Sequence, residues 1–305
     1  MKQLIPYTLL CWMSFIGLTA CDRVRSLPIP EPAPERAPES VPADPPENRP
    51  ETTPEVTPPA ASAQLWAADT GQPSWQTVWQ LQPQGQWGLE NLEQMTVLGD
   101  RFPSYFRVHY PARSASPTVA RTQGVPLGGT QFYASLGLPS QEALRLRYFV
   151  RFSENFDFMK GGKLPGLYGG AGNSGGDIPD GTDGFSTRLM WRQRGEGEVY
   201  AYLPTSIDHG TSIGRTGWRF QPGVWHQIEQ EVVLNQPGEA NGRIRLWLDG
   251  VMVVDQGGLT FRTVETLQIN GILFSTFFGG GDASWATPAD VFVDFADFAV
   301  YSGDR

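Results

Sequence analysis

From Gln64 onward the chain repeats short stretches in which apolar and polar residues alternate, separated by glycine, proline or Asp-Gly pairs. A period of two predicts half-buried β-strands, and apart from a turn near 139–143 no segment has the spacing of an amphipathic helix. We therefore predict an all-β domain, an antiparallel two-sheet β-sandwich of the jelly-roll type with a concave face. The clearest strands are expected at 144–152, 228–234, 244–248, 251–254, 269–278 and 291–301.

The first residues predict an exported lipoprotein. Lys2 precedes the apolar run Leu4–Ala20, which is shorter than a membrane span, and Leu18-Thr19-Ala20-Cys21 has the form of a lipobox. We expect residues 1–20 to be a cleaved signal peptide. Cys21 would then be the lipidated first residue of the mature chain.

Residues 21–63 are expected to form a disordered tether. The stretch 27–59 is rich in proline, and it has too little apolar surface to offset the entropy lost on ordering. The domain at 64–305 would lie outside the cytoplasm, in the periplasm or at the cell surface, held to a membrane through Cys21. Asp22 resembles a signal for retention at the inner membrane.

Charge and cysteine content exclude several kinds of site. The formal net charge is −9, and the domain stays acidic without the tether, which argues against nucleic acid as a partner. An anionic ligand would need a locally positive site. The only cysteines, Cys11 and Cys21, precede the domain, so cysteine nucleophiles and cysteine metal ligands are excluded. We expect no cofactor and a monomer.

The segment from Asn155 to Pro204 holds most of the residues that could do chemistry. We interpret its first half as a glycine-rich loop that carries Lys160 and Lys163, since glycines allow the backbone to approach a ligand. Its second half predicts two strands joined at Gly195-Glu196-Gly197. If the apolar faces of both strands point into one core, the residue numbers of two paired residues add up to an even number. Trp191 opposite Ala201 is one such pair. The other face then presents Ser186, Arg188, Tyr200 and Tyr202.

This group suits elimination from a uronic acid. A cation must neutralise the carboxylate, a base must take the C5 proton and an acid must protonate the departing C4 oxygen. Arg188 and Lys163 are the available cations, and they could lower the pKa of a tyrosine. The alternative at this point is a solvated sheet face with ordinary polar residues.

Other kinds of site fit this sequence less well. Gly172–Gly176 matches G-x-S-x-G in letters, but it lies in a loop without the strand and helix that a serine hydrolase needs. A two-carboxylate glycoside hydrolase or a loose calcium site would draw on acidic residues of a hairpin tip and a loop. The three histidines lack metal-ligand spacing, and we expect no metal. These acidic residues and histidines are Asp177, Asp180, Asp183, Glu196, Glu198, His109, His209 and His226.

Three motifs in this segment resemble polysaccharide lyase family 14, which includes alginate and glucuronan lyases. They are Lys160–Gly170 (KGGKLPGLYGG), Phe185–Trp191 (FSTRLMW) and Glu198–Tyr202 (EVYAY). Gly223–His226 and Asp249-Gly250 also fit, so the resemblance covers most of residues 100–301. It implies a jelly-roll lyase that cleaves polyuronates by β-elimination.

The resemblance also implies roles for individual residues. Lys163 and Tyr202 are expected to transfer protons, with the base left open between them. Arg188, helped by Ser186, would neutralise the uronate carboxylate, and Tyr200 would position the substrate. We expect further substrate contacts from Lys160, Arg192, His209 and Tyr168.

The sequence thus predicts a lipid-anchored lyase acting on an anionic polysaccharide of the alginate or glucuronan type. The alternative is a non-catalytic glycan-binding module or an envelope scaffold on the same fold. The two differ in whether an unsaturated sugar product forms.

Overall fold

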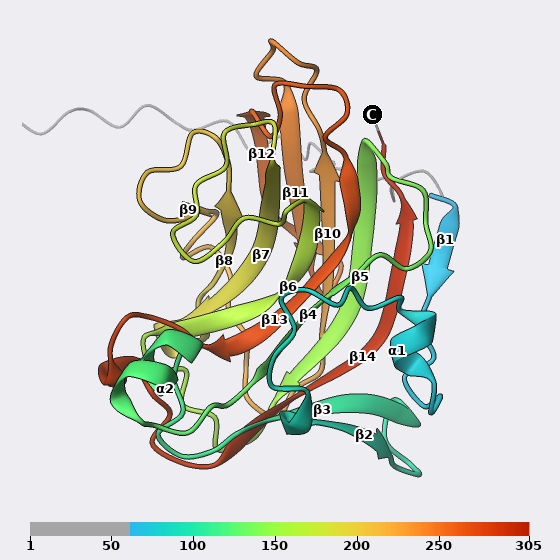
Figure 1. Ribbon diagram of the computed structural model, residues 1–305. Coiled ribbons are helices and arrows are strands. Elements are labelled where there is room, and N and C mark those ends of the chain that lie inside the picture. The colour runs from blue at the N-terminus through green and yellow to red at the C-terminus, as the bar shows by residue number, and fades with distance from the viewer. Residues whose placement is uncertain (1–61, 305) are drawn as a thin grey trace, which may run out of the picture. The chain divides into compact units, whose positions relative to one another are not determined.

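The computed structural model describes residues 62–304 (Figure 1). The signal peptide, Cys21 and almost all of the tether lie outside the described residues. Within 62–304 two antiparallel sheets pack face to face, which confirms the predicted sandwich (Figure 1). None of the helices in this part of the chain is long and apolar enough to cross a bilayer.

One sheet has eight strands in the order β12-β11-β10-β5-β14-β3-β2, with β1 paired to β14. Its strands are β1 (Gln64–Ala67), β2 (Leu92–Thr96), β3 (Ser104–Tyr110), β5 (Ala143–Phe152), β10 (His226–Val233), β11 (Gly242–Leu248), β12 (Val251–Leu259) and β14 (Val291–Ser302).

The second sheet has six strands in the order β4-β13-β6-β7-β8-β9. Its strands are β4 (Thr130–Ala134), β6 (Gly161–Gly170), β7 (Gly184–Arg192), β8 (Gly197–Tyr202), β9 (Thr211–Ile213) and β13 (Ile269–Phe278). In the part of the chain that the structure describes, helical structure is confined to α1 (Trp75–Val78), α2 (Pro117–Gln123) and the 3-10 turns η1 (Leu89–Asn91), η2 (Gln193–Gly195) and η3 (Ala283–Trp285).

The core lies between the sheets and follows the alternation in the sequence. On β5 the even-numbered side chains from Leu144 to Phe152 are buried against the other sheet, and the odd-numbered arginines point outward. On β7 Leu189 and Trp191 enter the same core. Because each strand buries one face, the opposite face of the six-stranded sheet is left to build a binding surface.

The segment with Lys163 is a strand and not the predicted glycine-rich loop. β6 lies in the middle of its sheet, between β13 and β7. Its glycines are needed for packing, because a Cβ on Gly162 would lie 2.0 Å from Cζ2 of Trp191 and one on Gly166 would lie 2.2 Å from the carbonyl oxygen of Thr187. The glycines of β6 leave room for the Trp191 ring and for the backbone of the neighbouring strand. The many glycines therefore indicate close packing and not a flexible loop.

A bulge interrupts β6 next to Lys163. The register against β7 shifts between Leu164 and Leu167, where Pro165 has no N–H to donate to a ladder. The Pro165 carbonyl instead accepts a 3.0 Å hydrogen bond from the Tyr148 hydroxyl across the core. The strand therefore continues through a proline at the cost of a local change of direction.

The β7–β8 hairpin has the predicted faces but a different register. Ser186 pairs with Tyr202 and Arg188 with Tyr200, so partner numbers do sum to an even value. Trp191 lies opposite Gly197 and not Ala201. The turn comes earlier than predicted, at η2, where Arg194 adopts φ 61°. The pairing differs from the example by an even number of positions, so every side chain keeps its face.

Candidate active site

A cleft of about 660 Å³ opens on the outer face of the six-stranded sheet. Its floor is formed by the facing side chains of three adjacent strands, and its rim by segments far apart in sequence. The floor residues are Lys163 on β6, Arg188, Met190 and Arg192 on β7, and Tyr200 and Tyr202 on β8; Trp87, Gln131, Ser174, His209, Phe277 and Trp285 belong to the surrounding wall.

Arg188 is a buried cation whose charge is not neutralised by the protein. Its side chain is only 2 % exposed, and Nη1 donates a 3.1 Å hydrogen bond to the Ser275 hydroxyl, a neutral partner. Its Nε has no hydrogen-bond partner. No carboxylate within residues 62–304 lies at ion-pair distance from it, and burial lowers its pKa. A guanidinium in this state favours an incoming anion.

Lys163 is the second cation of the floor. It is 9 % exposed, its Nζ lies 4.4 Å from the centre of the Tyr200 ring and it donates to Sδ of Met190 at 3.0 Å. Burial, and then the charges of Arg188 and Arg192, lower the pKa of Lys163 well below its usual value. The amine is therefore available in its neutral form at lower pH than an exposed lysine.

Tyr200 and Tyr202 stand side by side with their rings 5.7 Å apart. Tyr202 is 2 % exposed, yet its ring lines the cleft and does not belong to the core. Its hydroxyl accepts a 3.0 Å hydrogen bond from the Gly176 N–H and also interacts with the neighbouring Tyr200 hydroxyl. Burial, followed by the charge of Tyr202, raises the pKa of Tyr200 to about 12.

Ser186 lies beneath the loop that follows β6 and does not line the cleft. Its side chain is 0 % exposed, and its hydroxyl donates a 2.6 Å hydrogen bond to the Asn173 carbonyl. The Asn173 amide donates to Asp183 at 2.8 Å and to Asp177 at 3.2 Å. Ser186 thus holds the loop over Tyr202, and its hydroxyl is directed to the backbone of that loop.

The four expected substrate contacts fall at different places. Arg192 lines the cleft, and its Nε donates to the buried Glu198 carboxylate at 2.7 Å. His209 is exposed on the wall of the cleft. Lys160 is exposed at the rim, with Nζ bonded to the Ser284 hydroxyl and 6.0 Å from the Trp285 ring centre. Tyr168 faces a different pocket.

Sequence reasoning missed several cleft residues. Trp87 packs edge-on against Phe277 at 5.5 Å and walls the cleft from outside the expected motifs. Ser275, which binds Arg188, donates in turn to Gln131 at 2.9 Å. Met190 is not one of the missed residues, because alternation places it on the same face as Arg188 and Arg192. The others come from β13, β4 and the segment before β4, which no local pattern connects to β7.

The remaining candidates do not form sites. Residues 62–304 contain no group of three or more His, Cys, Asp or Glu side chains placed to hold a metal ion. His226 is structural, because Nδ1 lies 2.7 Å from the Asp249 carboxylate and Nε2 accepts from the Gln221 N–H at 2.9 Å. The Ser174 segment is not followed by a helix.

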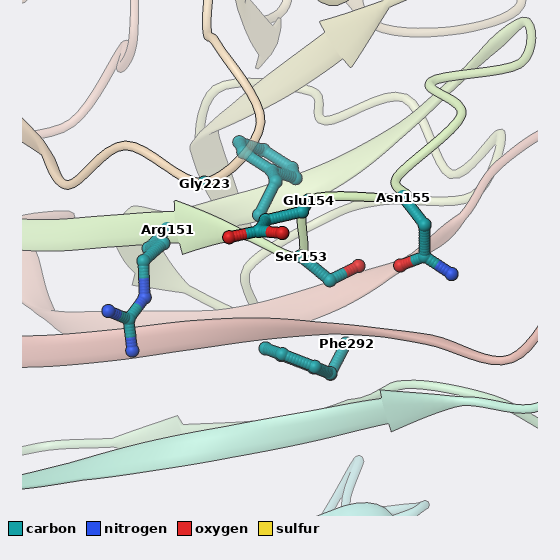
Figure 2. Close-up of a pocket in the computed structure, with 7 residues that line it drawn as sticks. Arg151, Ser153, Glu154, Asn155, Gly223 and Phe292 are labelled. Atoms are coloured by element: carbon teal, nitrogen blue, oxygen red, sulfur yellow. The ribbon is translucent and has the colours of Figure 1, made fainter.

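A hollow of about 380 Å³ at the end of β5 is lined by Arg151, Glu154, Asn155 and Phe292 (Figure 2). It belongs to the eight-stranded sheet and is separate from the cleft. Its guanidinium already faces Asp294 at 2.8 Å and Asp100 at 3.0 Å. This hollow therefore lacks the free cation that distinguishes the cleft.

Comparison with known proteins gives the family. A family model described as polysaccharide lyase 14 matches residues 100–298. The marine alginate lyase of Aplysia kurodai is 30% identical, covers 79% of this chain and 100% of its own, and superposes with a TM-score of 0.67. The alginate lyase vAL-1 from Chlorella virus is 21% identical over 78% of this chain and 99% of its own, with a TM-score of 0.65.

The endo-β-1,4-glucuronan lyase of the fungus Trichoderma reesei shares the fold at 12% identity, with 79% of this chain and 96% of its own covered and a TM-score of 0.53. A comparison with curated proteins gives no match. The family match contains the whole floor of the cleft, so the predicted resemblance is confirmed: the chain belongs to the polysaccharide lyase 14 family.

Proposed function

We propose that this protein cleaves a uronate-containing polysaccharide of the alginate or glucuronan type by β-elimination. The observation that carries the proposal is Arg188, a buried guanidinium without a carboxylate partner in the described chain, next to Lys163 and Tyr202. In a family of polyuronate lyases, the anion that would bind to Arg188 is a uronate carboxylate of the substrate.

Arg188 neutralises the carboxylate at C6 of the sugar. Neutralisation lets negative charge develop on the carboxyl group as the C5 proton leaves. The electrons of the C5–H bond form the C4–C5 double bond, and the C4–O bond to the leaving chain breaks. Ser275 and Gln131 keep the guanidinium in place, because Arg188 donates to the Ser275 hydroxyl at 3.1 Å and that hydroxyl donates to Gln131 at 2.9 Å.

Lys163 accepts the C5 proton and Tyr202 protonates the departing oxygen. The lowered pKa of Lys163 supplies a neutral amine for the first step. The Tyr202 oxygen is already occupied by the Gly176 N–H, so its own proton can be given to the leaving group. Tyr200, whose pKa of about 12 keeps it protonated, donates a hydrogen bond that positions the sugar.

The test is product formation from alginate and glucuronan, followed by the ultraviolet absorbance of the unsaturated sugar. Lys163→Ala and Tyr202→Phe should each abolish the absorbance increase while the folded state is retained. Tyr301→Phe is the matched control, because this tyrosine lies on β14 of the other sheet. Retention of the polymers without any absorbance change would overturn the enzyme and leave a glycan-binding module.

We further propose that the enzyme is a monomer, held to a membrane outside the cytoplasm through lipidated Cys21, with residues 21–63 as the tether. The lipobox and the proline content support this arrangement. Metabolic labelling with palmitate should mark the wild-type chain and not Cys21→Ser. Sedimentation of a chain beginning at residue 22 should give the mass of one copy.

A further inference from the structure

A second pocket, of about 690 Å³, lies on the same sheet as the catalytic cleft. We name it the neutral pocket, because none of the residues that line it carries a charge. The catalytic cleft in contrast contains Lys163, Arg188 and Arg192. The residues of the neutral pocket used below are Gln82, Gln84, Tyr133, Ser140, Tyr168 and Asn270.

The two pockets share one wall. The segment 81–87 runs beside β4 and makes bridges from Leu81 to Ala134 and from Trp87 to Gln131. Trp87 lines the catalytic cleft, whereas Gln82 and Gln84 line the neutral pocket. A polymer that follows this wall would pass from one pocket to the other.

The same strands also continue from one pocket to the other. Gln131 and Tyr133 lie two positions apart on β4, and the first lines the cleft and the second the neutral pocket. Lys163 and Tyr168 do the same on β6, at most about 16 Å apart along the strand, since a bulge lies between them. The neutral pocket is thus a few sugar residues away from the reacting bond.

The pocket offers hydrogen bonds and aromatic edges to a ligand. Tyr133 and Tyr168 meet edge to face at 5.0 Å. The Tyr168 hydroxyl and the Gln84 amide have no hydrogen-bond partner among residues 62–304, and burial raises the pKa of Tyr168 to about 12, so it stays a neutral donor. Asn270 is already engaged, with Nδ2 donating to the Ser140 hydroxyl at 3.0 Å.

A uronate is poorly matched to this pocket. Its carboxylate would lose water without gaining a cation, which costs free energy. A neutral sugar presents only hydroxyl groups and apolar C–H faces, which match phenols, amides and ring edges. The wall residues Gln82 and Gln84 lie outside the family match at residues 100–298.

We propose that the neutral pocket binds an uncharged sugar of the substrate, so that the protein cleaves all-uronate polymers such as alginate and glucuronan but prefers a polymer in which neutral sugars accompany the uronate. This proposal rests on the β-elimination proposed above. It predicts that an all-uronate polymer is cleaved less efficiently than one in which neutral sugars lie near the uronate.

The test compares kcat/KM on glucuronan, which is uronate throughout, with kcat/KM on deacylated gellan, in which 4-linked glucuronate lies among neutral sugars. The wild type should favour gellan. Tyr168→Phe should lower the ratio of gellan to glucuronan about fivefold, the effect of one hydrogen bond.

Gln84→Lys should raise kcat/KM on glucuronan about fivefold, because the new ammonium group pairs with a carboxylate. Gln84 is exposed, so the exchange should not disturb folding. Gln256→Lys, an equally exposed exchange on β12, is the matched control for charge. Wild-type preference for glucuronan, or no change in the ratio with either pocket variant, would overturn the neutral pocket. Absence of product from every polymer would instead overturn the lyase proposal.

Discussion

On the outer face of the eight-stranded sheet Arg107 and Arg151 share the buried carboxylate of Asp294, at 2.8 Å each. On the outer face of the six-stranded sheet Arg188 has no carboxylate partner in residues 62–304, although it is almost completely buried. Both faces consist of alternating strands with outward arginines. Arg192 on the second face also has a carboxylate partner, Glu198, so the difference lies in Arg188 alone, for which residues 62–304 supply no counter-charge.

The difference separates structural arginines from those available to a substrate. Arg145 and Arg245 repeat the paired arrangement, since both reach the buried Glu231 carboxylate. A paired guanidinium has little attraction left for a ligand, and removal of its partner leaves a buried charge. An unpaired one destabilises the free protein and is relieved when an anion binds. The comparison therefore predicts opposite effects of substitution on stability and activity.

The largest effect is expected for Arg188→Met. Loss of the cation that stabilises the developing charge should lower kcat/KM about 10³-fold. Thermal unfolding should be unchanged or shifted upward, because an uncompensated charge has been replaced by a side chain of similar length. A large fall in melting temperature with activity retained per folded molecule would break the comparison.

Asp294→Ala should show the reverse pattern. It leaves Arg107 and Arg151 without their shared carboxylate and should destabilise the fold by about 3 kcal/mol. Urea denaturation measures this change. Below the unfolding transition kcat/KM should stay at the wild-type value, since the residue lies on the other sheet. A stability equal to wild type would show that the pairing has no structural role.

Tyr200→Phe tests the role of a neutral side chain next to Arg188 in the cleft. Loss of a positioning hydrogen bond to a charged sugar should lower kcat/KM about tenfold, mainly through KM. The pH profile should keep its shape, because a phenol with a pKa of about 12 does not titrate in the working range. An altered acidic or basic limb would instead assign proton transfer to Tyr200.

The smallest effect is expected in the free energy of unfolding of Lys163→Met. The pKa of Lys163 is lowered in the folded state from its usual value of 10.5, so the unfolded chain binds more protons between the two values and wild-type stability rises with pH in that interval. The variant should gain about 1 kcal/mol below the lowered pKa. The gain should shrink as pH rises toward the ordinary lysine value. Urea denaturation at several pH values measures it, and a gain independent of pH would contradict the burial of a charged amine.

Local alternation predicted much of the face that lines the cleft. Arg188, Tyr200 and Tyr202 were placed together from the period of two alone, and a register error of an even number of residues did not separate them. The all-β architecture followed from the same pattern. These features depend only on neighbours in sequence or on the adjacent strand of a hairpin, so a single sequence is enough to predict them.

The sequence was misleading where glycines make room for large side chains and where contacts between distant segments place a residue. Trp218 and Phe278 lie close to glycines in the sequence, a setting that favours aromatic rings exposed to a sugar, but both are buried. Gly197 makes room for the Trp218 ring, since a Cβ there would lie 2.1 Å from its Cζ3 atom. Phe277 and Trp285 do line the cleft. The supports of Arg188, from Ser275 and Gln131, come from strands whose placement no local pattern determines.

The segment 81–87 has a consequence beyond the two pockets. β4 is the rim of the six-stranded sheet, and the bridges from Leu81 and Trp87 cover its outer hydrogen-bonding groups in part. The opposite rim is β9, which spans only Thr211–Ile213. An exposed edge strand can pair with the edge strand of another copy, which leads to aggregation. The six-stranded sheet can thus keep the face with the cleft open to a polymer while its two edges offer little for self-association.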